Sequence, residues 1–469
     1  MNYQANLSKL VEEIKAQGYK SVCMWQPAYN LGGGSAYLRF AKYLVEHTDL
    51  TVYYMDYKDG YLSYLLNAQP CIHFLHYDEN LLDFPVKEKC IIIVNSTRVV
   101  QMPRMNPENK LVFWHWETIP SAWDIVLINH EVKKYLELTK NNHAMIYHDW
   151  SARDSLNRYQ HIGFENKDYL MLTLPPKTVE CRKELVEADA INICFLSRLA
   201  NDKKRSLFYL IDNYAKYKTN KKKKLHIIGD GVAANEVKNF CKKFEKEIEF
   251  IFNGTVPKER LDDYLINHAD ILFGVGTSVL EGASLKIPSV VLLMDSRPIH
   301  DEDAFWVYDT KEYCMGILTE EKADFGVKYT KISEIIDSVY NKSNGKKDEG
   351  QKSYEYFIEN HSSMEQVIYS LLTFFKESTL TFKKLQKCIK YTPYCQLSIV
   401  KIKLLGINAI KIMQHVNTVR IYMGPLQIYK KVADRNKTKH YVFGINIMTT
   451  RRITGWKPLA TSFKDTKRG

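Results

Sequence analysis

Residues 269–293 constrain the fold more than any other part of the chain. They read ADILFGVGTSVLEGASLKIPSVVLL: an apolar run at 271–273 leads into the small-residue loop 274–278, and a second apolar run follows Pro288. This order predicts a strand, a tight glycine turn, a helix and a second strand, which form a βαβ unit. Backbone N–H groups at the start of that helix suit an anionic ligand such as a diphosphate. Glu281 lies one turn into the helix, where its carboxylate can accept hydrogen bonds from ligand hydroxyls.

Short apolar runs recur along the chain and predict an α/β protein. The first series lies at residues 22–25, 51–55, 71–75, 91–94, 111–114, 125–128, 144–147 and 169–174. Such uninterrupted runs are typical of strands buried on both faces of a parallel sheet. The pair Pro175-Pro176 indicates a linker. A second series begins at Ile191 and continues at residues 225–228, 248–252, 271–273 and 290–294.

These patterns divide the chain into four parts. The stretch SNGKKDEGQ, residues 343–351, is predicted as a polar loop, and Ser362-Ser363-Met364-Glu365 resembles a capping box that opens an apolar helix. Two doubly wound domains in tandem are the simplest architecture. We expect Rossmann-like domains at 1–178 and 179–352, a closing helix at 353–379 and an appendage at 380–469.

The appendage holds the excess positive charge. Residues 380–469 contain 19 Lys and Arg against Asp434 and Asp465, so this segment carries +17, whereas the other 379 residues carry −5 of the total of +12. The sequence LLGIN at 404–408 recurs as VFGIN at 442–446. Apolar pieces alternate with basic residues, which predicts either small hairpins or a flexible basic arm.

The cysteines and the amino terminus favour a cytoplasmic protein. Nine cysteines without a CxxC pair indicate neither a disulfide framework nor a zinc site, so small buried side chains in a reducing compartment are expected. The start of the chain lacks a basic region followed by an apolar one, and the two longest charge-free runs early in the chain contain proline, glycine or amides. We therefore expect neither a signal peptide nor a spanning helix.

Glycines and cations at predicted strand ends are the candidate ligand contacts. Gly32-Gly33-Gly34 lets backbone amides approach a ligand, or simply makes a βα turn, and the same turn explains Gly229-Asp230-Gly231. In FLSRLANDKKR, Arg198 and Lys203 flank the first strand of the second domain. A guanidinium and an ammonium held there would neutralise a diphosphate without a metal. The alternative for such residues is solvated surface charge, which fits Lys204 and Arg205 better.

Several of these motifs occur in the order found in a known family. SRLANDKK at 197–204, LHIIGDG, FNGTVPKERLDDYLINHADI and GVGTSVLEGASLKIPSVV resemble the donor-binding domain of the family 4 retaining glycosyltransferases, which have the GT-B fold. The resemblance is specific over about residues 190–295 and looser over 20–375. It implies two Rossmann-like domains that face each other across a cleft, with a nucleotide diphosphate sugar as donor and no metal cofactor.

The resemblance also implies roles for individual residues. Arg198 and Lys203 correspond to the pair that binds the pyrophosphate and stabilises it as leaving group, and Glu281 to the carboxylate that holds the ribose. Backbone N–H groups for the donor would come from Gly274, Gly276, Thr277 and Ser278, and, in the first domain, from Gly33 and Gly34.

By the same resemblance, Phe273 and one of two histidines correspond to positions near the donor sugar in this family. The family usually has a second glutamate eight positions before the ribose-binding one, and this chain has Phe273 there. The family often has a histidine near the donor sugar, and His115 in VFWHWE or His148 in IYHDWS fits that role. Core histidines satisfied by hydrogen bonds are the alternative for both.

Together these observations predict a glycosyltransferase that acts on a saccharide acceptor, lipid-linked, in cell-surface polysaccharide synthesis. We expect residues 380–469 to hold it at the inner face of an anionic membrane, where each engaged cation contributes about 1 kcal/mol. A solvated appendage and a nucleic-acid-binding arm are the alternatives for this segment, and nucleic acid is the less favoured. The rival function is a GT-B-like scaffold or nucleotide-binding protein that has lost catalysis and acts through its tail.

Overall fold

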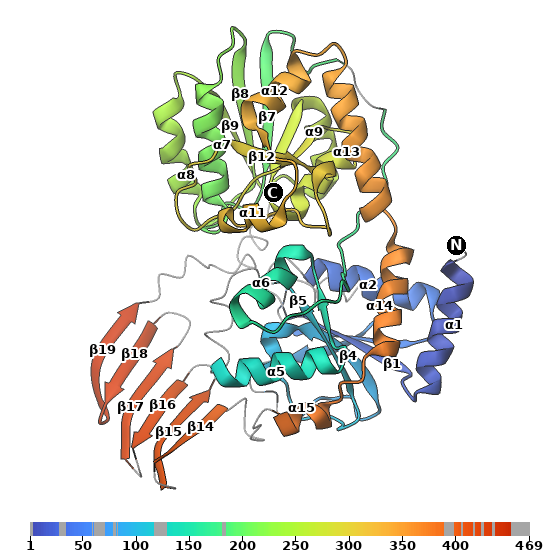
Figure 1. The fold of residues 1–469 in the computed structure, drawn as a ribbon, viewed down its shortest axis with the longest axis vertical. Coiled ribbons are helices and arrows are strands. Elements are labelled where there is room, and N and C mark those ends of the chain that lie inside the picture. Colours follow the sequence, from blue (N-terminus) through green and yellow to red (C-terminus); the bar gives the residue numbers. More distant parts are fainter. Residues whose placement is uncertain are drawn as a thin grey trace, which may run out of the picture. The chain divides into compact units, whose positions relative to one another are not determined.

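The computed structural model describes most of the chain. The described residues are 3–27, 34–58, 60, 71–77, 81, 83–116, 129–180, 184–388, 398–404, 407–415, 418–423, 426–433 and 437–451. Gly33 and the predicted strand at 125–128 lie outside them. The chain forms two compact units: residues 1–148, 152–170 and 365–469 make the first, and residues 149–151 and 171–364 make the second (Figure 1).

The first unit contains a parallel sheet of six strands in the order β3-β2-β1-β4-β5-β6. β1 lies between β2 and β4, and every residue of β1, β4 and β5 is buried, which explains their uninterrupted apolar sequences. The strands are β1 (Ser21–Trp25), β2 (Thr51–Tyr57), β3 (His73–Tyr77), β4 (Cys90–Asn95), β5 (Lys110–His115) and β6 (Met145–Tyr147). The helices are α1 (Tyr3–Ala16), α2 (Gly34–His47), α5 (Asn129–Asn141), α6 (Trp150–Gln160) and the 3-10 helix η1 (Ser96–Gln101).

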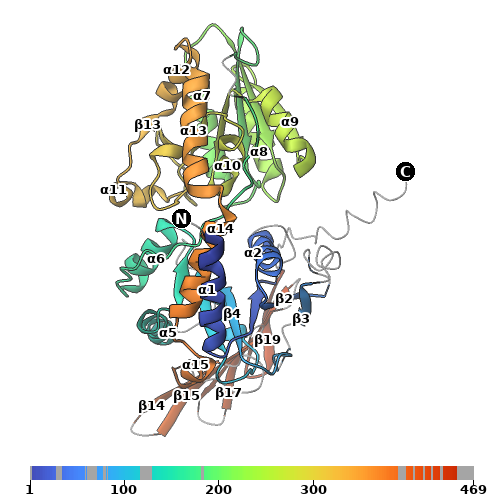
Figure 2. The same cartoon turned by 90° about the vertical axis from the view of Figure 1, so that its right-hand side faces the viewer.

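The chain returns to the first unit after completing the second. Helix α14 (Met364–Glu377) lies beside α1 (Figure 2), and the Lys376 ammonium pairs with Glu13 at 2.7 Å. The segment that follows is hydrogen-bonded to the start of β5, because Leu111 donates to Leu380 and Phe382 donates to Asn109. Helix α15 (Phe382–Cys388) completes this part. The amino-terminal unit is therefore completed by residues more than 200 positions later in the sequence than its last strand.

The second unit contains a sheet of seven strands in the order β13-β12-β11-β10-β7-β8-β9. β7 to β11 are parallel, and β12 and β13 are added antiparallel at one edge. The strands are β7 (Ala190–Leu196), β8 (Lys222–Ile228), β9 (Glu249–Gly254), β10 (Ile271–Gly274), β11 (Ser289–Val291), β12 (Asp303–Trp306) and β13 (Thr330–Lys331). The helices are α7 (Lys204–Lys216), α8 (Ala234–Cys241), α9 (Lys258–His268), α10 (Val279–Ala283), α11 (Lys322–Phe325), α12 (Ile332–Tyr340) and α13 (Gly345–His361), with short 3-10 turns between them. Two Rossmann-like α/β units confirm the predicted fold class.

The predicted polar loop at 343–351 is wrong, because α13 begins at Gly345. The Lys346 ammonium pairs with the fully buried Asp270 at 2.6 Å, so a polar sequence is used inside the unit rather than on its surface. Gly350 lies where a Cβ atom would be 2.2 Å from the Lys286 carbonyl oxygen, so close packing requires glycine at this position. The predicted single closing helix at 353–379 is likewise two helices, α13 and α14.

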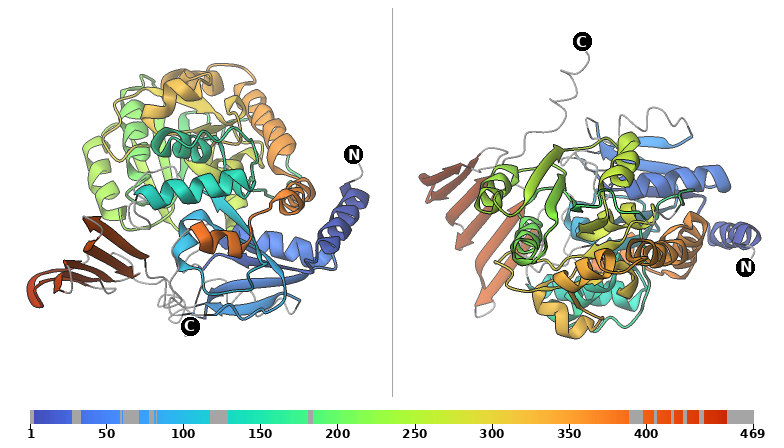
Figure 3. Two further views of the ribbon diagram at one scale, coloured as in Figure 1. Left: turned by 60° about the horizontal axis from the view of Figure 1, so that its bottom comes forward. Right: turned by 90° about the horizontal axis from the view of Figure 1, so that it is seen from above.

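The tail forms a sheet, so the hairpin alternative describes it and the flexible-arm alternative does not. Six antiparallel strands pair in sequence order (Figure 3): β14 (Ser398–Leu404), β15 (Ile407–His415), β16 (Thr418–Met423), β17 (Leu426–Ala433), β18 (Lys437–Val442) and β19 (Ile445–Arg451). The two repeated sequences fall at the β14–β15 and β18–β19 connections. None of the tail side chains that the structure describes between residues 410 and 449 is buried.

Candidate functional site

The strand order of the second unit defines one topological switch point. β8 and β9 lie on one side of β7, whereas β10 and β11 lie on its other side. In open parallel sheets the crevice at the carboxyl ends of the two strands flanking such a point is where ligands bind. Here those strands are β7 and β10, and their last residues, Leu196 and Gly274, are paired in register. The loops that carry Arg198 and the predicted glycine turn therefore start side by side.

The glycine turn is a short 3-10 segment that leads into α10. Gly274 ends β10, Gly276, Thr277 and Ser278 form the 3-10 turn, and α10 follows. Gly276 has φ of +73°, which favours glycine, and its N–H donates to the Met315 carbonyl at 2.5 Å. The turn is held by its own protein contacts before any ligand arrives.

Lys203 lies against this turn. Its ammonium donates to the Val275 carbonyl at 3.2 Å, and a Cβ atom on Gly276 would lie 3.5 Å from the same nitrogen. Burial lowers the pKa of Lys203, the carboxylate of Asp202 raises it, and the positive charge of Arg198 lowers it. A partly buried cation held beside a small-residue turn at a switch point is a suitable partner for an anion.

Arg198 lies in the loop that follows β7 and is more accessible. Its side chain is 56% exposed and pairs with Asp202 at 3.7 Å. Its backbone is held on both sides, because Ser197 donates to Ile228 and Leu199 donates to Asp230 at 3.1 and 3.0 Å. The guanidinium can therefore adjust to a ligand while its backbone stays in place.

The turn Gly229-Asp230-Gly231 supports the Arg198 loop. Gly229 has φ of +129°, and a Cβ atom there would lie 2.0 Å from the Ser197 carbonyl oxygen. Gly231 has φ of +155°, and its Cβ would lie 2.4 Å from the Leu199 carbonyl oxygen. Both glycines are thus required by contact with the residues on either side of Arg198, in agreement with the expected βα turn.

Glu281 lies in the first turn of α10, and its side chain is mostly buried. Its Oε2 contacts two ammonium groups, that of Lys258 and that of Lys177 at 3.5 Å. Lys177 also pairs with Asp262 at 2.6 Å. Sequence reasoning missed both lysines, because they lie 23 and 104 positions from Glu281 and no motif links them. These two contacts fix the orientation of the carboxylate.

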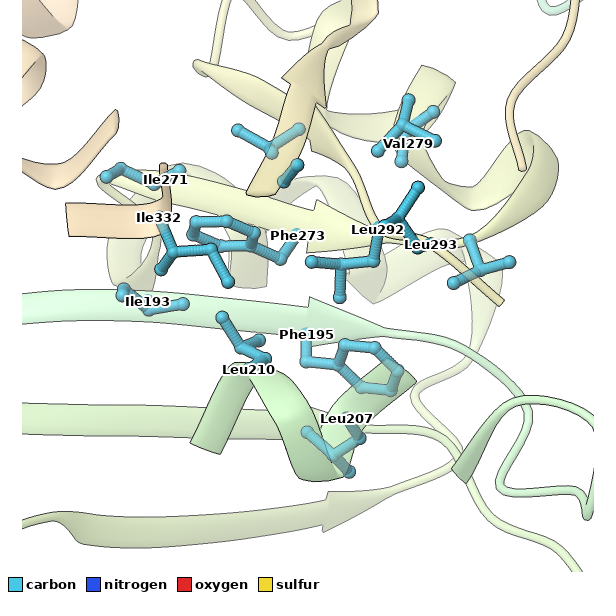
Figure 4. Packing of buried hydrophobic residues seen from close by; sticks show 14 of the residues in the cluster. Ile193, Phe195, Leu207, Leu210, Ile271, Phe273, Val279, Leu292, Leu293 and Ile332 are labelled. Carbon is cyan, nitrogen blue, oxygen red and sulfur yellow. The ribbon is translucent and has the colours of Figure 1, made fainter. Parts of the chain in front are cut away.

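Phe273 belongs to the core rather than to a ligand-facing loop. It is fully buried on β10, and Figure 4 shows its ring among Ile193, Ile332 and Leu292. An ionised carboxylate in this apolar cluster would be costly without a partner. The structure thus explains why phenylalanine suits this position in this chain.

The two predicted histidines lie at adjacent strand ends of the first unit. His115 ends β5, His148 follows β6, and the His148 N–H donates to the His115 carbonyl at 2.9 Å. His115 is fully buried, and its Nδ1 lies 2.7 Å from the Ser96 hydroxyl, which fits the core alternative. His148 is partly buried beside Trp116, and burial lowers its pKa to about 4, so the imidazole is neutral at pH 7. Its Nδ1 is buried and has no hydrogen-bond partner among the described residues.

Gly34 is the first residue of α2, which follows β1, one of the two strands at the switch point of the first sheet. Gly33 lies outside the described residues. Among the described residues no helix is long and apolar enough to cross a bilayer. Within the same residues no group of three or more His, Cys, Asp and Glu side chains is placed to hold a metal ion.

Comparison with known proteins gives structural but no sequence relatives. No family model matches this sequence, and no significant match occurs among curated proteins. Solved structures that resemble the chain include HepE of Anabaena in complex with UDP and glucose (10% identity, TM-score 0.46, 76% of this chain and 98% of that one). Others are the lipopolysaccharide outer core galactosyltransferase WaaB (12%, 0.47, 75% and 98%) and a glycosyltransferase from Rickettsia africae (14%, 0.45, 76% and 98%).

Proposed function

We propose that this protein is a retaining glycosyltransferase that moves a sugar from a nucleotide diphosphate sugar to a saccharide acceptor. The observation that carries the proposal is the pair of cations at the switch point of the second sheet. Arg198 follows β7, and the Lys203 ammonium contacts the turn that follows β10. A diphosphate at this edge would meet both cations and N–H groups of the turn other than that of Gly276, which donates to Met315.

The proposed chemistry requires stabilisation of a leaving group rather than a protein nucleophile. Negative charge develops on the diphosphate as the bond to the sugar breaks, and cations already in place stabilise that charge without reorganisation. Glu281 would accept hydrogen bonds from the ribose hydroxyls, and its two lysine partners hold its carboxylate in place. His148, whose imidazole is neutral and whose Nδ1 has no hydrogen-bond partner among the described residues, is the better of the two histidines for a sugar hydroxyl. Because Arg198 and Lys203 supply the positive charge, we propose that no metal is required.

We further propose that the acceptor is lipid-linked and that the product belongs to a cell-surface polysaccharide. The support is the charge distribution: a tail of +17 on a body of −5 would hold the enzyme at an anionic membrane from the cytoplasmic side. At a membrane surface, an acceptor anchored in lipid is concentrated near the enzyme.

The first test is thermal stabilisation by UDP, GDP and ADP, because a ligand that binds only the folded state raises the melting temperature. Turnover of the matching nucleotide sugar is then measured with and without EDTA, for the wild type, Arg198→Ala and Glu281→Ala. The proposal is supported if a nucleoside diphosphate binds the wild type, and if turnover persists in EDTA but is abolished by each of the two substitutions. Binding without turnover would favour the inactive scaffold, and absence of binding would reject both functions.

A further inference from the structure

Exposed apolar side chains gather at one end of the tail sheet. The β16–β17 and β18–β19 connections both lie at this end, since β17 starts at Leu426, β18 ends at Val442, and the Phe443 N–H donates to the Ile428 carbonyl at 3.2 Å. Phe443 and Ile445 are 67% and 70% exposed, and Met423 and Leu426 are 56% and 62% exposed. We call this set the apolar tip: Met423, Leu426, Phe443 and Ile445.

Phe443 has a backbone conformation that is unfavourable for a bulky side chain. Its φ is +46°, and that of Gly444 is +84°, so both central residues of the β18–β19 turn have positive φ, as in a type I′ turn. Asn-Gly and Asp-Gly are the preferred pairs for such turns, and a bulky side chain in the left-handed region is a conformational outlier. Phe443 is not a preferred residue for this turn, and its side chain is not buried within the chain. An interaction with a partner outside the chain explains its presence better than a contribution to folding.

Cations lie on the strands just behind the apolar tip. Arg420 is three residues from Met423, Lys430 is four from Leu426, and Lys439 is four from Phe443. At a strand rise of about 3.3 Å per residue, the three cations lie about 10–13 Å behind these apolar residues along their own strands. Lys430 also pairs with Tyr441, which places it about 7 Å behind Phe443. The Lys430 ammonium lies over the Tyr441 ring at 5.6 Å, so it stays on the sheet surface at this height.

We propose that the apolar tip inserts shallowly into an anionic lipid bilayer, with the tail strands standing end-on to its surface. Apolar groups that lie 5–10 Å into the boundary between headgroups and acyl chains bring side chains about 10–13 Å behind them to the lipid phosphates. Charge complementarity favours a bilayer, because the tail has 19 basic and only 2 acidic residues and the apolar tip has none of either. This inference rests on the membrane attachment proposed above, and it assigns that attachment to one end of one sheet.

The test uses the full-length protein and vesicles of phosphatidylcholine, with and without phosphatidylglycerol. Phe443→Asn creates the preferred Asn-Gly turn, so its melting temperature is expected to equal or exceed that of the wild type. Its partition onto anionic vesicles is expected to fall about tenfold, because a phenylalanine no longer enters the bilayer. Lys430→Glu should weaken binding to anionic vesicles only. Phe74→Asn, which removes a partly exposed phenylalanine from β3, is the matched control and should bind like the wild type.

The outcomes separate this inference from the proposed function. If the wild type and Phe443→Asn bind anionic vesicles equally well, the tip does not insert into the bilayer. The proposed attachment of the tail to the membrane would then still stand. Failure of the wild type to bind any vesicle would overturn both the attachment and the tip. Glycosyl transfer to a water-soluble acceptor is measured in parallel, and it should be the same for the wild type and Phe443→Asn. A further outcome is that the wild type binds no vesicle but self-associates in a concentration-dependent way, and that Phe443→Asn abolishes this self-association. This result would overturn insertion and identify a second copy of the chain as the partner of the tip.

Discussion

The edges formed by the carboxyl ends of the parallel strands differ in chemistry between the two sheets, although the strand orders are alike. In the second unit, the loops at this edge carry Arg198, Lys203 and the ion-paired Glu281. In the first unit, the strand ends carry His115, which is buried, and His148, which is neutral beside an aromatic ring. Charged side chains gather at this edge of the second sheet, whereas the corresponding edge of the first sheet has neutral and aromatic ones. The comparison teaches that two sheets of similar strand order can present different chemistry at the same edge.

The largest effect should come from the cations of the second unit. Lys203→Ala is expected to lower kcat by about 10²–10³-fold, the usual cost of removing one group that stabilises developing charge. Steady-state kinetics with the nucleotide sugar identified by the thermal screen measures it. Lys204→Ala is the control, since that ammonium pairs with Glu236 at 2.7 Å. An equal loss of kcat in Lys203→Ala and Lys204→Ala would show that this edge of the second sheet is not specialised to stabilise negative charge.

The next effect tests whether the turn Gly229-Asp230-Gly231 constrains the loop that carries Arg198. Gly229→Ala places a methyl group 2.0 Å from the Ser197 carbonyl oxygen and should lower the free energy of unfolding by about 2–4 kcal/mol. Gly254→Ala, at φ of +60° with nothing within 4 Å, should cost only about 1 kcal/mol. Urea denaturation compares the two. If the costs are the same, the contact with Ser197 does not constrain the loop.

Much of this fold could be predicted from its sequence, because buried parallel strands require uninterrupted apolar runs. The runs at 22–25, 91–94 and 271–273 all became strands. The start of α13 could not be predicted, since its polar residues are explained only by Asp270, 76 positions away. The lysines that hold Glu281 were missed for the same reason: contacts distant in sequence leave no local pattern.

A smaller effect concerns the nucleotide rather than the reaction step. Glu281→Gln keeps the shape of the side chain but removes its charge, so the KM for the nucleotide sugar should rise about tenfold while kcat changes less. Titration with the free nucleoside diphosphate should show the same weakening. A loss in kcat alone would place Glu281 with the reacting groups instead of with the ribose.

The last effect, which is confined to acid pH, tests the neutrality of the first edge. Burial lowers the folded-state pKa of His148 from 6.5 to about 4, so the unfolded state binds the proton more readily. Its neutral form should therefore stabilise the fold above pH 6.5, and this contribution should decline by about 3 kcal/mol as the pH falls to 4. His226, buried on β8 with its pKa also lowered to about 4, adds a similar loss. Unfolding curves of His148→Gln should be flatter over this range, and an unchanged slope would contradict a buried neutral imidazole.

The discontinuity of the first unit has a consequence for biosynthesis. The ribosome releases β1 to β6 long before α14, whose apolar side chains Ile368, Leu371 and Phe375 are buried in the finished protein. Until residue 377 has left the exit tunnel, the nascent amino-terminal sheet lacks its last covering helix, while residues 171–364 can already form their own core. Truncation by a premature stop codon directly after Met364 would thus leave an intact second unit joined to an incomplete first one, a substrate for chaperones and proteases.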